Sequence, residues 1–178
     1  MESVEEHAAA VLAAVPDYVW DGQRLPVPVP DIADTCFGLL VIDADDPATA
    51  PGAPSLGADH TLSGLLLAHR REIWVNAAEA REWPGRRRFT IGHELGHWCL
   101  HREGGSESVF CRETCVQEAV KPELPPAEAE ANAFAAAMLM PPALLREQYQ
   151  RTKGDFHALC QIFGASQSAM GRRLHAVI

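Results

Sequence analysis

Residues 89–101 read FTIGHELGHWCLH, a stretch that joins two histidines to a glutamate within five positions. On a helix, His93 and His97 lie one turn apart on the same face, so both imidazoles can reach one metal ion. Glu94 follows the first histidine, where a carboxylate can serve as general base. His101 repeats the four-residue step, but eight residues of helix place it about 12 Å along the axis from His93, too far to share an ion. We therefore expect His101 to have a hydrogen-bonding or surface role.

A third ligand is expected from a second helix, PAEAEANAFAAAMLM at residues 126–140. This segment is apolar on nearly every side, which predicts burial, and a buried carboxylate must be paired or bind a metal. Glu128 meets that condition, and Asn132 lies one turn further on, where it can orient a ligating imidazole. Glu130 can instead point to solvent at the helix start, where negative charge is favourable. Two histidines and Glu128 would leave one tetrahedral position for water, as in catalytic zinc sites.

The helix that carries the histidines must also be held in place. Ile91, Leu95 and Trp98 fall on the face opposite the histidines, and this stripe predicts packing against a sheet. Gly92 and Gly96 each cost a helix about 1 kcal/mol relative to alanine. Their presence indicates that another backbone approaches this helix closely.

The segments before this helix predict a small sheet. LPVPVP (25–30) is expected to be an extended connector, because alternate prolines remove the donors of a central strand. Three later segments are strand-like, namely FGLLVID (37–43), LSGLLLA (62–68) and EIWVN (72–76). The last of them could present an edge to an extended substrate. Residues 103–126 are expected to form a long irregular segment between the two helices.

Strands followed by helices predict an α+β fold. We expect a small sheet of about three strands packed on the helix with the two histidines, followed by a mainly helical C-terminal part. The expected division is a core over residues 1–140 and a helical subdomain over 141–178, the two parts forming one compact unit. The sequence HALCQIFGASQSAMGRRLHAV in the second part resembles two short helices about a glycine-containing turn.

Composition excludes several classes of protein. A formal net charge of −9 over 178 residues argues against nucleic-acid binding through the whole surface. The N-terminus is acidic where a secretion signal would be basic, and the apolar run CFGLLVI is too short to cross a bilayer. Five cysteines without an export signal predict reduced thiols in the cytoplasm. Cys111 and Cys115 have the spacing of a metal-binding pair, but no second pair matches them, and unliganded thiols are the preferred interpretation.

Together these motifs resemble the ImmA/IrrE family of zinc metallopeptidases. The resemblance rests on RRRFTIGHELGHWCLH followed by ExEANxFAAxxLMP, and it extends from about Leu25 to the C-terminus through LPVPVPDIAD, LSGLLLAHRREIWVN and FGASQSAMGRRL. It implies that His93 and His97 bind Zn²⁺, with Mn²⁺ as an alternative, and that Glu94 is the catalytic base. Zincins with an ExxxN element use its glutamate as third ligand, which implies a gluzincin-like site with Glu128 as ligand and Asn132 behind it.

The resemblance also implies a partner. Members of this family cleave repressors of the Xre/CI type and so switch on mobile elements or stress genes. The expected substrate is therefore an Xre-family repressor protein, with no direct nucleic-acid or membrane partner. Larger relatives of the IrrE type carry a GAF-like sensor domain, for which this chain is expected to be too short, and residues 103–126 are longer than the family leads us to expect.

Two alternatives to an enzyme remain open on the sequence. Residues 141–178 carry five Lys/Arg against two Asp/Glu, so the helix-turn-helix-like pattern could bind DNA or dock a DNA-binding partner. The chain could also be a non-catalytic metal-bound interaction protein, such as a toxin–antitoxin component. The intact Glu94 favours the enzyme. Tyr18, Tyr149 and several histidines are available as the donor to an oxyanion.

Overall fold

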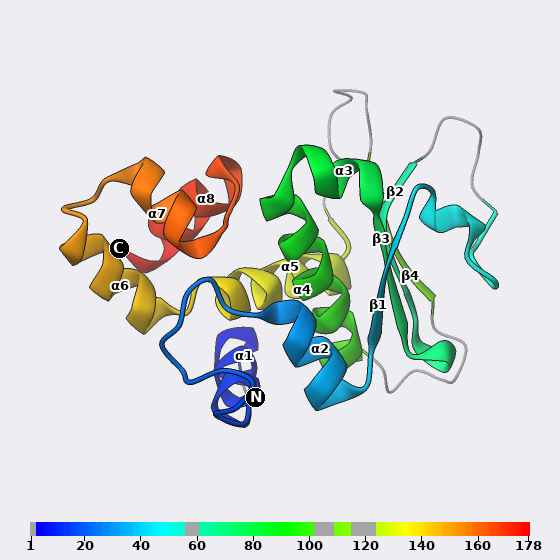
Figure 1. Ribbon diagram of the computed structural model, residues 1–178, viewed down its shortest axis with the longest axis horizontal. Helices are drawn as coiled ribbons and strands as arrows, with labels where there is room; N and C mark the ends of the chain where they lie inside the picture. The colour runs from blue at the N-terminus through cyan, green and yellow to red at the C-terminus, as the bar shows by residue number, and fades with distance from the viewer. Residues whose placement is uncertain (1–2, 56–60, 102–108, 115–123) are drawn as a thin grey trace.

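The computed structural model describes residues 3–55, 61–101, 109–114 and 124–178, the third range as backbone only. Its α-helices are α1 (Val4–Ala13), α2 (Val29–Phe37), α3 (Ala77–Glu82), α4 (Pro84–His101), α5 (Pro126–Leu139), α6 (Pro142–Arg151), α7 (Phe156–Phe163) and α8 (Gln167–Val177). Its strands are β1 (Leu40–Ala44), β2 (Thr61–Leu67), β3 (Glu72–Asn76) and β4 (Val109–Thr114), with the short 3₁₀ helices η1 (Pro47–Thr49) and η2 (Ala68–Arg70). The chain is therefore α+β, as the sequence predicts (Figure 1).

The sheet has the strand order β1-β3-β2-β4, one strand more than the sequence predicts. Strand β3 pairs in parallel with β1 and antiparallel with β2, and β4 pairs antiparallel with β2. The prediction that residues 72–76 form an exposed sheet edge is therefore wrong, because β3 has a hydrogen-bonded neighbour on each side. The two edges of the described sheet are β1 and β4.

Helix α4 lies on one face of this sheet, and the η1 segment lies on the other (Figure 1). Leu66 and Ile73 join the main core together with Ile91 and Leu95 of α4, which confirms the packing predicted for the apolar stripe. The second face of the sheet has a smaller cluster of its own, formed by Ala50, Leu62, Leu65 and Leu67. The alternation of strand side chains thus divides the apolar residues between two layers.

Two elements depart from the sequence prediction. Residues 29–37 form helix α2, which overlaps the end of the expected connector (25–30) and the start of the expected strand (37–43). Pro30 lies in its first turn, where a missing N–H costs nothing, and Gly38 ends it in the left-handed conformation with φ 62°. The predicted strand at 37–43 accordingly begins only at Leu40. Strand β4 lies within the segment predicted to be irregular, 103–126.

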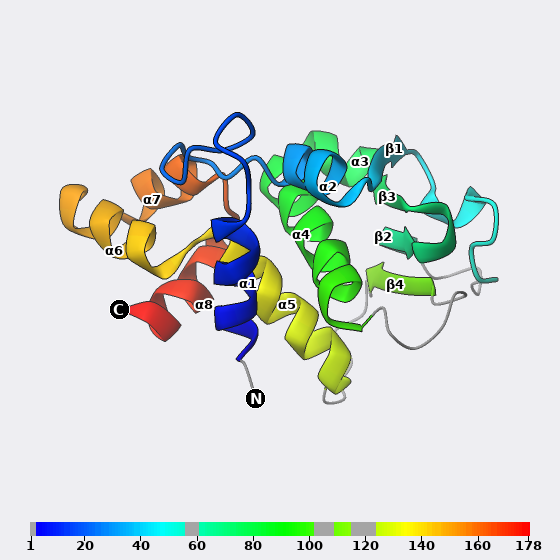
Figure 2. The same ribbon diagram turned by 90° about the horizontal axis from the view of Figure 1, so that it is seen from below.

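Helices α4 and α5 lie between the sheet and the group α6–α8 (Figure 2). Leu145, Leu159, Phe163 and Met170 of α6–α8 belong to the same apolar cluster as the residues of α4 and α5. The division at residue 140 between a core and a helical C-terminal subdomain stays a prediction. Among the described residues, no helix has both the length and the apolar character that crossing a lipid bilayer requires.

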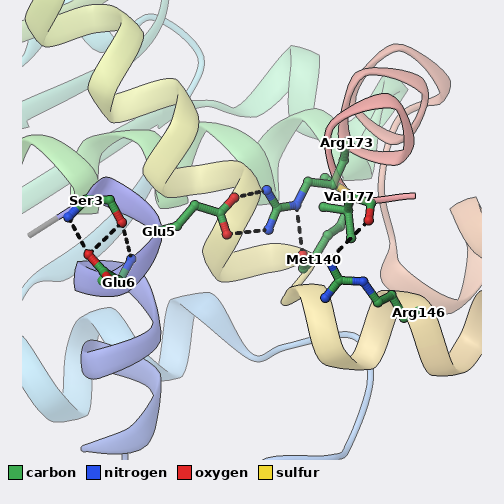
Figure 3. Close-up of polar contacts among 7 residues, drawn as sticks. All are labelled: Ser3, Glu5, Glu6, Met140, Arg146, Arg173 and Val177. Carbon is green, nitrogen blue, oxygen red and sulfur yellow. Dashed lines mark hydrogen bonds and ion pairs between the residues drawn. The ribbon is translucent and has the colours of Figure 1, made fainter.

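The N-terminal helix is tied to the C-terminal helix by an ion pair (Figure 3). Arg173 of α8 is buried, and its guanidinium donates to both carboxylate oxygens of Glu5 in α1 and, over 3.0 Å, to the carbonyl oxygen of Met140. Ser3 and Glu6 form a capping box at the start of α1. The charge of Arg173 is thus satisfied only when α1 is in place beside α5 and α8.

We expect Glu5→Ala to lower the free energy of unfolding by about 1–3 kcal/mol, because it leaves a buried guanidinium with one partner fewer. Urea unfolding followed by circular dichroism measures this. The matched control is Glu147→Ala, which removes an exposed ion pair of α6 with a separation of 3.5 Å and should cost less than about 1 kcal/mol. Equal stability of the two variants would contradict a role for the Glu5–Arg173 pair.

Candidate metal centre

The start of helix α4 is fixed by consecutive arginines that reach different parts of the fold. Arg87 makes two hydrogen bonds with Asp43 at the end of β1, with N···O distances of 2.7 and 2.8 Å. Arg88 is partly buried and donates to the carbonyl oxygen of Val27 in the connector before α2. These contacts tie the first turn of α4 to the sheet and to the connector, so the helix has little freedom to slide.

Helices α4 and α5 approach each other at Gly92 and Gly96, where the sequence predicts the close approach of another backbone. A Cβ atom at Gly96 would lie 3.1 Å from the Cα atom of Ala131, and one at Gly92 would lie 3.3 Å from the Cβ atom of Ala135. The contacts run in opposite directions along the two helices, which are therefore antiparallel. This close approach brings the N-terminal turns of α5 against the face of α4 that carries the histidines.

Three predicted residues converge at this contact. The Nε2 atoms of His93 and His97 are 3.1 Å apart, and they lie 3.1 and 3.0 Å from the two carboxylate oxygens of Glu128. Both histidine side chains are 1% exposed, whereas Glu128 is 26% exposed. Among the described residues, these three form the group of side chains that could hold a metal ion.

The donor set fits a divalent cation. Nδ1 of His93 lies 3.0 Å from Oδ1 of Asn132, an oxygen that only accepts, so this contact selects the tautomer with the proton on Nδ1. The Nε2 lone pair of His93 is then directed at the carboxylate of Glu128, and two electron-rich groups this close require a cation or a proton between them. Ligands of a tetrahedral zinc ion lie about 3.4 Å apart for bonds of about 2.1 Å, close to the separations observed here.

Electrostatics agree with this arrangement. Burial raises the pKa of the Glu128 carboxyl group. Hydrogen bonds from His93 and His97, which form when a proton rather than a cation lies at their Nε2 atoms, outweigh burial and hold that pKa well below its usual range. Glu128 is therefore an anion at neutral pH. A carboxylate and two imidazoles are ligands that Zn²⁺ accepts readily.

Glu94 is fully buried beside these residues, on the side of α4 that faces strand β2. Its carboxylate approaches Gly64, where a Cβ atom would lie 3.0 Å from Oε1. The sequence prediction did not include Gly64. A glycine in the interior of a predicted strand was the available signal, because such a glycine often marks the close approach of another group.

His101 and Glu130 lie outside the cluster of three. They approach each other with an Nε2–Oε2 distance of 3.5 Å, and Glu130 is half exposed. The two side chains that the sequence predicts not to be ligands are thus placed together, with His101 one turn after His97 and Glu130 two residues after Glu128.

The remaining predicted positions lie elsewhere. Tyr18 is 82% exposed, and the ring of Tyr149 in α6 packs against Gly154. Cys36, Cys99 and Cys160 are not in disulfide bonds. Cys115 lies outside the described residues, as does the side chain of Cys111, so the spacing of these two cysteines carries no structural assignment.

Comparison with known proteins supports the sequence resemblance. The model of the IrrE N-terminal-like domain, a peptidase family, matches residues 41–175, a range that includes the histidines, Glu94 and Glu128. The fold is similar to that of a Mycobacterium tuberculosis transcriptional regulator, with a TM-score of 0.53 and 16% sequence identity. That similarity covers 97% of this chain and 47% of the regulator, so the chain spans about half the length of its structural relative. No curated protein matches the chain.

Proposed function

The chain belongs to the ImmA/IrrE family of peptidases, and we propose that it is a zinc-dependent endopeptidase that cleaves a transcriptional repressor of the Xre/CI type. The observation that carries the peptidase assignment is the convergence of His93, His97 and Glu128 beside a buried Glu94. In this proposal His93, His97 and Glu128 hold the metal, and Asn132 fixes the ring of His93. A zinc ion at such a site lowers the pKa of a water molecule and polarises a peptide carbonyl group.

The residues of the chain supply the remaining steps. Glu94 takes a proton from the attacking water and delivers it to the amine that leaves when the peptide bond breaks. Burial of the two imidazoles excludes bulk water, which strengthens electrostatic interactions inside the site. The hydrogen bond from His93 to Asn132 keeps the imidazole in the tautomer and orientation that metal binding needs.

The repressor is proposed from the family resemblance, with support from the charge of the chain. Residues 141–178 carry more basic than acidic side chains, while the whole chain has a net charge of −9. Arg151, Lys153 and Arg172 are all exposed in this part of the chain. A surface of this kind suits docking to a folded protein partner, which would give a peptidase specificity beyond a short sequence motif.

We expect the purified chain to cut a purified Xre-type repressor, encoded beside its own gene, at one or two positions. Intact-mass measurement of the mixture identifies the fragments. A chelator should stop the reaction, and Zn²⁺ or Mn²⁺ should restore it, because the three ligands cannot supply the chemistry alone.

Casein is the control substrate, and we expect little cleavage of it. Broad degradation of casein and other unfolded proteins would contradict the proposed specificity. A repressor that binds tightly but stays intact would instead favour a non-catalytic regulator, such as a toxin–antitoxin component.

A further inference from the structure

Gly64 lies in the interior of strand β2, directly against helix α4. A Cβ atom at this position would lie 2.3 Å from the Cγ2 atom of Thr90 and 3.0 Å from Oε1 of Glu94. The first distance is a steric overlap, and the second is tighter than an ordinary van der Waals contact. Since Thr90 and Glu94 are both buried, neither side chain can move away into solvent.

The backbone does not explain this glycine. Gly64 pairs with Val75 of β3 in the regular ladder and does not have a left-handed φ, so other residues could adopt its conformation. A glycine in a strand interior weakens the strand, because it has no side chain to pack. Gly64 therefore serves to leave space between β2 and α4, and the side chains of Thr90 and Glu94 occupy that space.

The neighbouring residue fixes this part of β2 relative to α4. The hydroxyl oxygen of Ser63 accepts a hydrogen bond from Nη2 of Arg86 over 3.2 Å, and the hydroxyl donates to Oε1 of Glu79 over 3.1 Å. The pairing of β2 with β4 shifts register between Leu62 and Gly64, which leaves Ser63 as the extra residue of a bulge. Arg86 therefore holds the strand at the point where Gly64 meets the helix.

We propose that Gly64 is a positioning residue for Glu94, an inference that rests on the proposed function because it takes Glu94 as the general base. The absent Cβ atom leaves a slot between β2 and α4, and Thr90 closes one side of this slot. The slot positions the carboxylate of Glu94 next to His93. It makes no contribution to metal binding. A methyl group in the slot displaces the carboxylate and leaves the three ligands in place.

The test uses the double variant Gly64→Ala/Thr90→Ser. Serine lacks the Cγ2 atom that a Cβ at position 64 would overlap, so the double variant should fold where Gly64→Ala alone is strained. The contact with Glu94 persists in it. Gly171→Ala is the matched control, because a Cβ atom at Gly171 meets nothing within 4 Å.

The probe is acetohydroxamic acid, titrated into Co²⁺-loaded protein and followed by visible absorption. A hydroxamate binds a metal ion and donates a hydrogen bond to a carboxylate beside it, so its affinity reports the position of Glu94 without any cleavage. We expect Glu94→Gln and the double variant to bind the probe about tenfold more weakly than the wild type, with unchanged cobalt content. Gly171→Ala should bind like the wild type.

The kinetics of repressor cleavage provide the second readout. The double variant should lose about tenfold or more in kcat, with KM within about twofold of the wild type, because substrate binding does not use the slot. Wild-type probe affinity in the double variant would overturn the proposal, and so would loss of cobalt from it or wild-type affinity in Glu94→Gln. A repressor that stays intact while the probe shows the expected pattern rejects only the proposed substrate.

Discussion

Replacement of Glu94 by glutamine is expected to lower the rate of repressor cleavage by about 10²–10⁴-fold. The amide has nearly the shape of the carboxylate but cannot take a proton from water at neutral pH. Because Glu94 is fully buried and is not one of the three ligands, the variant should keep both its metal and its fold. Single-turnover cleavage, zinc content and the thermal midpoint Tm measure these three properties on the same preparation.

The matched control for this prediction is Glu130→Gln, which makes the same change on the half-exposed carboxylate beside His101. It should cleave the repressor at the wild-type rate. Cleavage by Glu94→Gln at that rate would show that another group is the general base. A large fall in Tm together with lost activity would show that Glu94 is needed for folding rather than for proton transfer.

The parts of the site that could be predicted from sequence are those set by spacing along single helices. His93 and His97 share a face because the helix has 3.6 residues per turn, and the same rule places Asn132 one turn after Glu128. Gly92 and Gly96 predicted the close approach of another backbone, and α5 supplies that backbone. In each case the information is local, and the structure adds only the partner.

The errors and omissions concern contacts between distant segments. Strand β3 was expected at an edge, but its parallel partner β1 lies about 30 residues earlier, and no turn signal announces such a crossover. Helix α2 begins in a proline-rich stretch that also suits an extended connector. The hydrogen bonds of Arg87 with Asp43 bridge 44 residues, and nothing in a run of three arginines selects those partners.

The position of Gly64 combines both kinds of information. A glycine inside an aliphatic strand is a visible signal of close approach, but the signal does not say what approaches. The register shift beside Ser63 decides which residue of β2 faces Thr90 and Glu94. Knowledge of the helix and of the strand separately was therefore insufficient to find the slot.

Loss of any one of the three ligands is expected to remove most of the metal. Two ligands remain in each of the variants His93→Ala, His97→Ala and Glu128→Ala. Loss of a residue that only orients a ligand lowers metal affinity about 10–100-fold, and we expect each of these variants to lose considerably more. Asn132→Ala, which keeps the three ligands and removes only the contact with Nδ1 of His93, should show that smaller loss. Elemental analysis after dialysis, with competition against a chromophoric chelator, ranks the four variants.

The same ranking should appear in stability, since a ligand that binds only the folded chain stabilises it by about 4 kcal/mol at a thousand times its Kd. Zinc should therefore raise the Tm of the wild type strongly, that of Asn132→Ala less, and those of the ligand variants hardly at all. Glu130→Ala and His101→Ala are controls, and both should respond to zinc like the wild type, because their side chains pair with each other outside the cluster. Full zinc retention by Glu128→Ala would contradict its assignment as third ligand.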